Sequence, residues 1–456
     1  MNEALWNKVL QFDLDNPGGD YSFSVRLASE NRWIKDFTEK AILEYKKFMY
    51  LAAVSEVMVS PSAIVDVVWH QHLIFSQSYA DFCVLLGKNI QHIPSTHNKA
   101  QFDQFKKAAE QTRKLYTDHF GQQPESIWRY DTMLDSLSLE PAKVKIGFFA
   151  LFGIFAVIVL SIPFYYLLKP IYIHIDNPNF ILCFVGVWLA AYVIIHLYTK
   201  SRFKEIAHSF DKQSFVYHLK PFEVIYLKGH KMEDVINGAV SELIHSGAIR
   251  VDLGRRICIS DEKEGLTGEQ LQVITTLKNR GSFFYPQLLQ SLQTKAIFRN
   301  TARSIDQLRW CFNQSLQFAK LFYLNFIVFA ALIIFPLIRL ATGISRGKPV
   351  FQVAVLLALL IVFAVNYLYK LNQQFFSRTM PDLYKETILP AIKEEQDWRW
   401  DYFLYGSAVL TASLIPLVNY QRSSTVYAGG DGGSGGGSCG SSCGSSCGSC
   451  GGCGGD

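Results

Sequence analysis

Four long apolar runs without a charged side chain constrain this chain more than any other feature. They cover residues 146–168, 180–198, 321–338 and 350–369, and none contains aspartate, glutamate, lysine or arginine. A helix that crosses a bilayer needs about 20 apolar residues, because each residue adds about 1.5 Å against a hydrocarbon core of about 30 Å. Buried helices of soluble domains rarely run so long without a charge. The sequence therefore predicts a mainly α, polytopic helical membrane protein. The lipid bilayer is one of its expected partners.

A fifth apolar run, residues 403–418, is shorter than the other four. Small and polar residues and Pro416 interrupt it. A run of this length is either a weak fifth span or a packed helix, and the interruptions favour the packed helix.

The orientation in the membrane follows from the N-terminus and from the basic flanks of the runs. Residues 1–14 lack the apolar core of a signal peptide. Basic residues precede the first run at Lys143 and Lys145 and follow the second run at 200–204, which favours the cytoplasmic side. Three basic residues between the third and fourth runs argue in the opposite direction. We expect a multi-pass protein of the inner or plasma membrane, with its N-terminus in the cytoplasm.

Residues 1–135 form the first soluble unit. Apolar residues recur at helical spacing from Trp33 to Phe48, a second helix is expected from Ser60-Pro61 to Gly87, and a third covers about 100–119. We expect an all-helical N-terminal domain.

Residues 200–320 form the second soluble unit. Helices are expected at 221–227 and 232–245, then a β-hairpin at 248–260, then helices at 267–279 and 284–318. Helix, helix, hairpin is the order of a winged-helix-like cytoplasmic module.

DNA binding by this second unit is disfavoured by its charges. The helix at 232–245 would be the recognition helix, and its expected exposed residues are Glu233, Asp234, Asn237, Ser241 and Glu242. Carboxylates repel phosphates, and the net charge of the chain is only +5. We therefore expect no nucleic-acid partner.

One dense constellation of polar residues invites a metal hypothesis. It consists of residues within or just after one expected helix: Asp66, Trp69, His70, His72, Tyr79, Cys83 and His92. Residues four apart share a helix face, so Asp66 and His70 lie together while His72 points away. Asp66, His70 and His92 are the candidate ligands, and Zn²⁺ is the candidate ion. The favoured alternative is structural: Asp66 orients His70 by a hydrogen bond, and Trp69 fills the core.

The same region resembles a known family. The segments YKKFMYLAA, VDVVWHQHLIFSQSYADFC, IQHIP and YTDHFGQQPESIW, within residues 45–128, are similar to the glycine-rich domain-containing protein-like family. The resemblance implies membership rather than a mechanism, because that family has no settled biochemical activity. The whole architecture resembles bacterial uncharacterised membrane proteins with a Gly/Cys-rich C-terminal tail.

The tail itself, residues 429–456, is almost entirely glycine, serine and cysteine. Such a composition predicts disorder, because it buries too little apolar area to offset its ordering entropy. The tail carries five thiols, Cys439, Cys443, Cys447, Cys450 and Cys453. In the cytoplasm these thiols are expected to stay reduced and free to bind a soft metal ion, and outside the cell they can form disulfides.

The function predicted from these features is a membrane-anchored interaction or scaffold protein with unidentified protein partners. No phosphate loop, dinucleotide fingerprint or nucleophile elbow is present. The alternative is a metal-dependent membrane hydrolase that uses the Trp-His-x-His region. The sequence does not decide the oligomeric state.

Overall fold

The computed structural model describes residues 2–16, 19–93, 99–391 and 397–420. The described chain is mainly helical, with three short strands, which confirms the predicted class. The predicted disordered tail, residues 429–456, lies outside the described residues.

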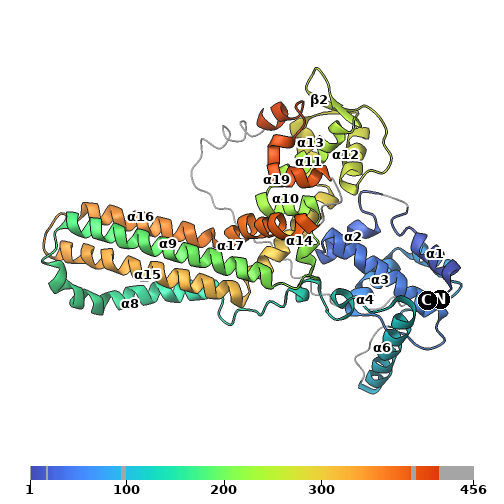
Figure 1. Cartoon of the computed structure of the whole chain (residues 1–456), viewed down its shortest axis with the longest axis horizontal. Coiled ribbons are helices and arrows are strands. Elements are labelled where there is room, and N and C mark those ends of the chain that lie inside the picture. Colours follow the sequence, from blue (N-terminus) through green and yellow to red (C-terminus); the bar gives the residue numbers. More distant parts are fainter. Residues whose placement is uncertain (1, 17–18, 94–98, 392–396, 421–456) are drawn as a thin grey trace, which may run out of the picture.

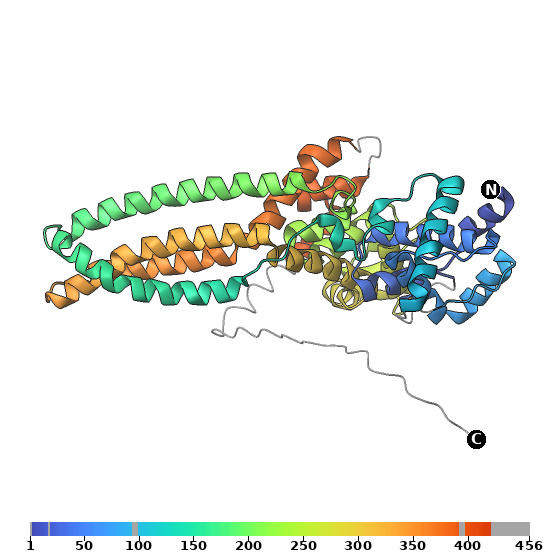
Figure 2. The same cartoon turned by 90° about the horizontal axis from the view of Figure 1, so that it is seen from below.

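Four long helices form one elongated bundle that projects from a body made of the remaining elements (Figures 1 and 2). The bundle helices are α8 (Ile146–Tyr172), α9 (Asn177–Ser209), α15 (Leu316–Ser345) and α16 (Phe351–Tyr369). Each is long and apolar enough to cross a membrane, as the sequence predicts. None of the most apolar stretch of α8 is buried inside the protein. Apolar side chains that face outward along such a length are typical of lipid contact.

The end of the bundle that points away from the body is fastened by Arg339 of α15. This side chain is buried, with 9% of its surface exposed. It donates hydrogen bonds to the carbonyl oxygens of Tyr172 and, at 2.6 Å, Ile175, and to Asn177 Oδ1 at 2.8 Å. Arg339 thus satisfies backbone acceptors at the C-terminus of α8.

The N-terminal unit is all helical, as expected. Its elements are α1 (Glu3–Gln11), α2 (Phe23–Asn31), α3 (Lys35–Val54), α4 (Ala63–Ile74), α5 (Ser76–Leu86), α6 (Lys99–Phe120), α7 (Glu125–Trp128) and η1 (Met133–Leu137). The buried carboxylate of Glu44 on α3 joins three of them. It accepts hydrogen bonds from the Tyr116 hydroxyl at 2.8 Å and the Trp128 indole at 2.7 Å, and it pairs with Lys47 at 2.7 Å.

The single helix expected up to Gly87 is wrong, because the chain breaks at Phe75. This residue has φ −86° and ψ 61°, which ends α4 and starts α5. Its ring packs edge-on against Phe23 with the ring centroids 5.5 Å apart. The apolar residues keep their helical spacing across Phe75, so the sequence does not show the break. The break coincides with the contact between Phe75 and Phe23 on α2.

The second unit contains α10 (Pro221–Gly229), α11 (Met232–His245), β1 (Ile249–Val251), β2 (Arg256–Ile259), α12 (Gly268–Lys278), β3 (Ser282–Phe284), α13 (Tyr285–Gln293) and α14 (Ala296–Asn313), preceded by η2 (Phe215–Tyr217). The predicted hairpin forms, with Ile249 opposite Ile259. A third strand was missed: β3 pairs antiparallel to β2, with Arg256 opposite Phe284. The helix expected over 284–318 is divided into α13 and α14, and α15 begins separately.

The expectation that Asn237 and Ser241 of α11 are exposed is also wrong. Their exposed fractions are 3% and 0%. The Asn237 side chain accepts a hydrogen bond from the Tyr285 hydroxyl, and Ser241 Oγ accepts one from the backbone N–H of Thr411 at 3.0 Å. Helix α11 is therefore covered on this face by α13 and by the C-terminal segment.

After the bundle, the chain returns to the body through α17 (Leu371–Gln374), η3 (Phe375–Thr379), α18 (Met380–Leu383), η4 (Tyr384–Ile388), η5 (Leu389–Ala391), α19 (Trp398–Tyr405) and η6 (Gly406–Val409). The fifth apolar run lies in this part. It bends after Tyr405 and again near Leu410, and Leu414 is fully buried in the body. The run is thus a packed segment, and within the described residues only the four bundle helices qualify as spans.

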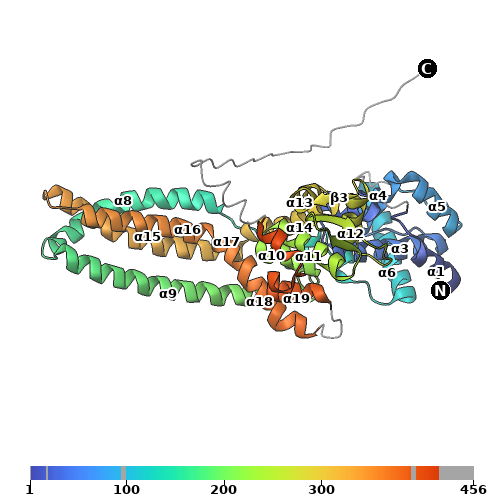
Figure 3. The same cartoon turned by 90° about the horizontal axis from the view of Figure 1, so that it is seen from above.

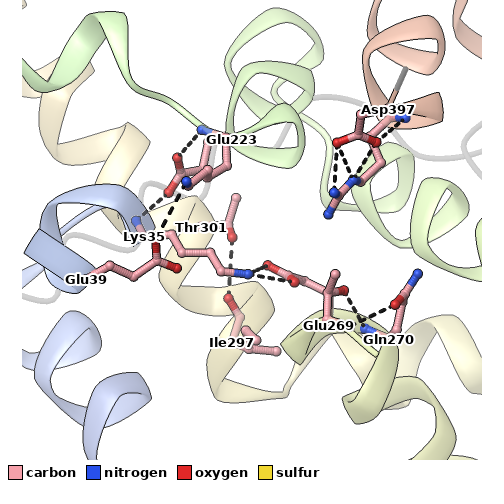
Figure 4. A network of polar contacts seen from close by, with 11 residues as sticks. Lys35, Glu39, Glu223, Glu269, Gln270, Ile297, Thr301 and Asp397 are labelled. Carbon is pink, nitrogen blue, oxygen red and sulfur yellow. Dashed lines mark hydrogen bonds and ion pairs between the residues drawn. The ribbon is translucent and has the colours of Figure 1, made fainter. Parts of the chain in front are cut away.

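The two soluble units share one hydrophobic core at the same end of the bundle. A polar network crosses between them (Figure 4). The backbone N–H of Lys35 donates to Glu223 Oε1 at 2.8 Å, and the Lys35 ammonium pairs with Glu269 at 3.2 Å. The units predicted separately from the sequence therefore form one continuous body.

Candidate metal centre

Two of the three candidate ligands lie one turn apart on α4. Ser62 begins this helix, and its side chain accepts a hydrogen bond from the backbone N–H of Val65 at 3.2 Å. Asp66 lies in the first turn and His70 follows four residues later, so their side chains share a face.

The third ligand, His92, returns to α4 because the chain reverses after α5. Gly87 takes a left-handed conformation with φ 69°, which glycine adopts without steric cost. Lys88 then anchors the returning segment: its ammonium donates to the carbonyl oxygens of Ala52 and Ser55, each at 2.8 Å. These contacts hold the segment that carries His92 against the end of α3.

The structure brings Asp66, His70 and His92 together. His92 Nε2 lies 2.9 Å from Asp66 Oδ1, and His70 Nδ1 lies 3.2 Å from Asp66 Oδ2. One ligand atom from each residue fits within 4.8 Å of the others. Neighbouring ligands around tetrahedral Zn²⁺ are about 3.3 Å apart when the bonds are about 2.0–2.1 Å long. The two distances between imidazole and carboxylate are therefore close to the spacing of a zinc site, and the three donor atoms lie within 4.8 Å of one another.

The site is buried on one side and open on the other. The His92 side chain is 13% exposed, whereas that of His70 is 55% exposed. Two imidazoles and a carboxylate are a donor set that suits Zn²⁺, and they leave one tetrahedral position for water or a further ligand. Within the described ranges this is the only group of three histidine, cysteine or acidic side chains so arranged.

Tyr79 positions the segment that carries His92. Its hydroxyl donates to the carbonyl oxygen of Ile90, two residues before His92, and accepts from the Trp69 indole N–H at 3.1 Å. Burial raises the pKa of Tyr79 to about 12, so the hydroxyl keeps its proton at neutral pH. The Trp69 ring also packs edge-on against the His92 imidazole, with centroids 4.6 Å apart. The sequence placed Tyr79 in the constellation but gave no signal of this contact with the Ile90 backbone.

His72 points away from Asp66 and His70, as helical spacing predicts, and the structure places it in the core. It is fully buried between the Tyr45 hydroxyl, 2.8 Å from Nδ1, and Ser78 Oγ, 3.0 Å from Nε2. Burial lowers the pKa of His72 to about 4, so the imidazole is neutral at physiological pH. Cys83 is likewise buried.

The present contacts also satisfy the structural alternative. The Asp66 carboxylate faces both imidazoles, and His70 Nδ1 lies 2.9 Å from the Asp66 carbonyl oxygen. A metal bound through this nitrogen requires the neutral tautomer whose proton is on Nε2, so this hydrogen bond to the carbonyl oxygen would be lost.

Comparisons with known proteins give no further assignment. No protein-family model, no curated protein and no solved structure matches the chain significantly. The resemblance to the glycine-rich domain-containing protein-like family stays a prediction.

Proposed function

We propose that the chain is a membrane-anchored interaction protein whose N-terminal unit binds Zn²⁺ through Asp66, His70 and His92. The observation that supports the proposal most is the gathering of three donor atoms within 4.8 Å, from two elements that the fold brings together. The bound ion would join α4 to the segment before residue 94. Metal binding energy of this kind stabilises the folded arrangement directly.

The interaction role is supported by the arrangement of the body. All described elements outside the bundle gather at one end, which suits a platform held at one membrane surface. We propose the cytoplasmic surface, on the strength of the basic flanks at Lys143, Lys145 and 200–204. The helix, helix, hairpin order of α10, α11, β1 and β2 supports a winged-helix-like packing module within this platform.

Metal content of the full chain tests the zinc site. The five tail cysteines are replaced by serine, so that they do not contribute, and the purified protein is equilibrated with Zn²⁺ and dialysed. We expect one zinc per chain at pH 7.5, lost in Asp66→Asn and His92→Ala and retained in the matched control His245→Ala, which changes an exposed histidine elsewhere. Equal zinc content in the site variants and the control would contradict the proposal.

A second candidate function is a metal-dependent hydrolase. It is favoured by the half-open site, because three protein ligands leave a position at which zinc can activate water. The test is zinc-dependent hydrolysis of an activated ester by the zinc-loaded chain, compared with His70→Ala. Stoichiometric zinc without hydrolysis supports the interaction role, whereas hydrolysis abolished by His70→Ala supports the enzyme.

A further inference from the structure

A second site lies where the bundle meets the body. A cavity of about 400 Å³ opens beside the end of α9 that faces the body, and its walls come from α9, α10, the stretch from α17 to η4, and α19. Figure 3 shows the end of α9 next to α18. Lys200 on the α9 wall is the first charged residue after the uncharged stretch of that helix. The cavity therefore lies at the depth where the apolar surface of the bundle ends.

The cavity is strongly basic. Lys200, Lys228, Arg378 and Lys385 line it, and the single carboxylate in the lining is Asp382. Lys228 donates to the carbonyl oxygen of Phe403 at 2.8 Å. Burial and the charge of Lys385 lower the pKa of Lys228, against the opposing effect of Asp234 and Asp382. Among the described residues, the other three cations form no ion pair.

Two wider helical turns carry two of these cations, Arg378 and Lys385. The N–H of Met380 bonds to the carbonyl of Phe375, five residues back, so η3 is a π-helical turn. Pro381 has no N–H to donate to Ser377, which removes the bond that an α-helix would make there. A second π-helical turn, η4, contains Lys385. Such turns are rare and occur frequently at functional sites.

The lining also offers one polar atom without a partner. Nδ1 of His196, which lies on α9 in the cavity wall, is shielded from solvent and has no hydrogen-bond partner among the described residues. The hydroxyl-bearing residues Ser377 and Thr379 flank Arg378 in the same wall. A shielded polar atom such as His196 Nδ1 is normally satisfied, so a ligand with acceptor oxygens fits the lining.

We propose that this cavity binds a phosphate group at the membrane surface, carried by the headgroup of an anionic lipid. A guanidinium and three ammonium groups match the charge and the acceptor oxygens of a phosphate. Basic pockets at the cytoplasmic ends of membrane helices bind anionic headgroups for the same reason. The location at the end of the α9 apolar run favours the lipid over soluble phosphate as the source.

The test compares two double variants of the full chain, delipidated in a neutral detergent. Arg378→Gln with Lys385→Gln removes two exposed cations of the cavity. The matched control, Arg202→Gln with Lys320→Gln, removes one arginine and one lysine at the ends of apolar runs but outside the cavity. Dissociation constants are measured by thermal-shift titration with dioctanoyl phosphatidylglycerol, dioctanoyl phosphatidylcholine and inorganic phosphate.

We expect phosphatidylglycerol to bind more tightly than phosphatidylcholine, and its Kd to rise roughly tenfold or more in the cavity variant. In the control variant the Kd should change by less than about twofold. If inorganic phosphate binds and its Kd also rises only in the cavity variant, the cavity is a phosphate site, but its ligand is soluble phosphate rather than a lipid headgroup. Equal losses in both variants, or no loss in the cavity variant, overturn the proposal.

Discussion

Replacing Glu223 by glutamine is expected to flatten the pH dependence of stability. Glu223 is buried where the two soluble units meet, and it accepts hydrogen bonds from the backbone N–H groups of Lys35 and Lys220, each at 2.8 Å. Burial raises the pKa of Glu223 from 4.5 to about 7, against the opposing effect of these two hydrogen bonds. The carboxyl group therefore titrates near neutral pH in the folded chain.

The direction of the effect follows from proton binding. Between the unfolded and folded pKa values the folded chain holds a proton that the unfolded chain has released, so stability falls as pH rises. The contribution of the protonated acid is fully present below pH 4.5 and is lost as the pH passes 7. Over the whole interval the loss is about 3 kcal/mol, and from about pH 5.5 to about pH 8 it is about 2 kcal/mol.

The assay is the midpoint of thermal unfolding of the full chain in detergent, measured from pH 5.5 to 8. Glutamine resembles the protonated acid at every pH, so Glu223→Gln should lose less stability across this range, by about 2 °C in Tm for a chain of this length. The control is Glu39→Gln, which removes a more exposed carboxylate from the same network (Figure 4). Parallel curves for the wild type and Glu223→Gln would refute the reasoning.

Three further predictions follow from single contacts. Tyr79→Phe removes the hydroxyl that holds the Ile90 carbonyl, so the zinc Kd, measured by competition with a chelating dye, should rise about 10- to 100-fold; an unchanged Kd would show that Tyr79 does not position the site. Glu44→Ala removes the acceptor shared by Lys47, the buried Tyr116 hydroxyl and the half-buried Trp128 indole, and should destabilise the chain by about 3–5 kcal/mol, visible as a lower Tm, which an unaltered melting curve would contradict. Arg339→Leu should speed hydrogen exchange at residues 173–177 by about tenfold or more, and equal exchange in the variant and the wild type would exclude the fastening role.

The sequence predicted those features that depend on local pattern. An apolar run without charged residues can be recognised from consecutive residues alone, so the sequence predicted all four bundle helices. The proximity of Asp66 and His70 follows from helical spacing alone. The proximity of His92 was a hypothesis that rested only on residue type, because the return of the chain depends on the turn at Gly87 and on the contact between Tyr79 and Ile90.

Features that depend on distant contacts were missed or wrong. The break at Phe75 accompanies packing on Phe23, 52 residues earlier in the chain, and helical periodicity does not reveal it. The strand β3 has three residues, too few for alternation to show. The burial of Ser241 depends on the segment around Thr411. The sequence also does not show that the two soluble units share a core, because two apolar runs lie between them and indicate two separate domains.

The shared core also means that the two soluble units can pack together only late in synthesis. Lys35 meets Glu269 only after a further 234 residues have been added. At about 5–20 residues per second, this interval is on the order of ten seconds or more. Both α8 and α9 leave the ribosome within it. The surface of the N-terminal unit that Glu223 and Glu269 later cover is therefore exposed until both of these helices have been synthesised, and docking of the second unit follows the synthesis of the first helical pair.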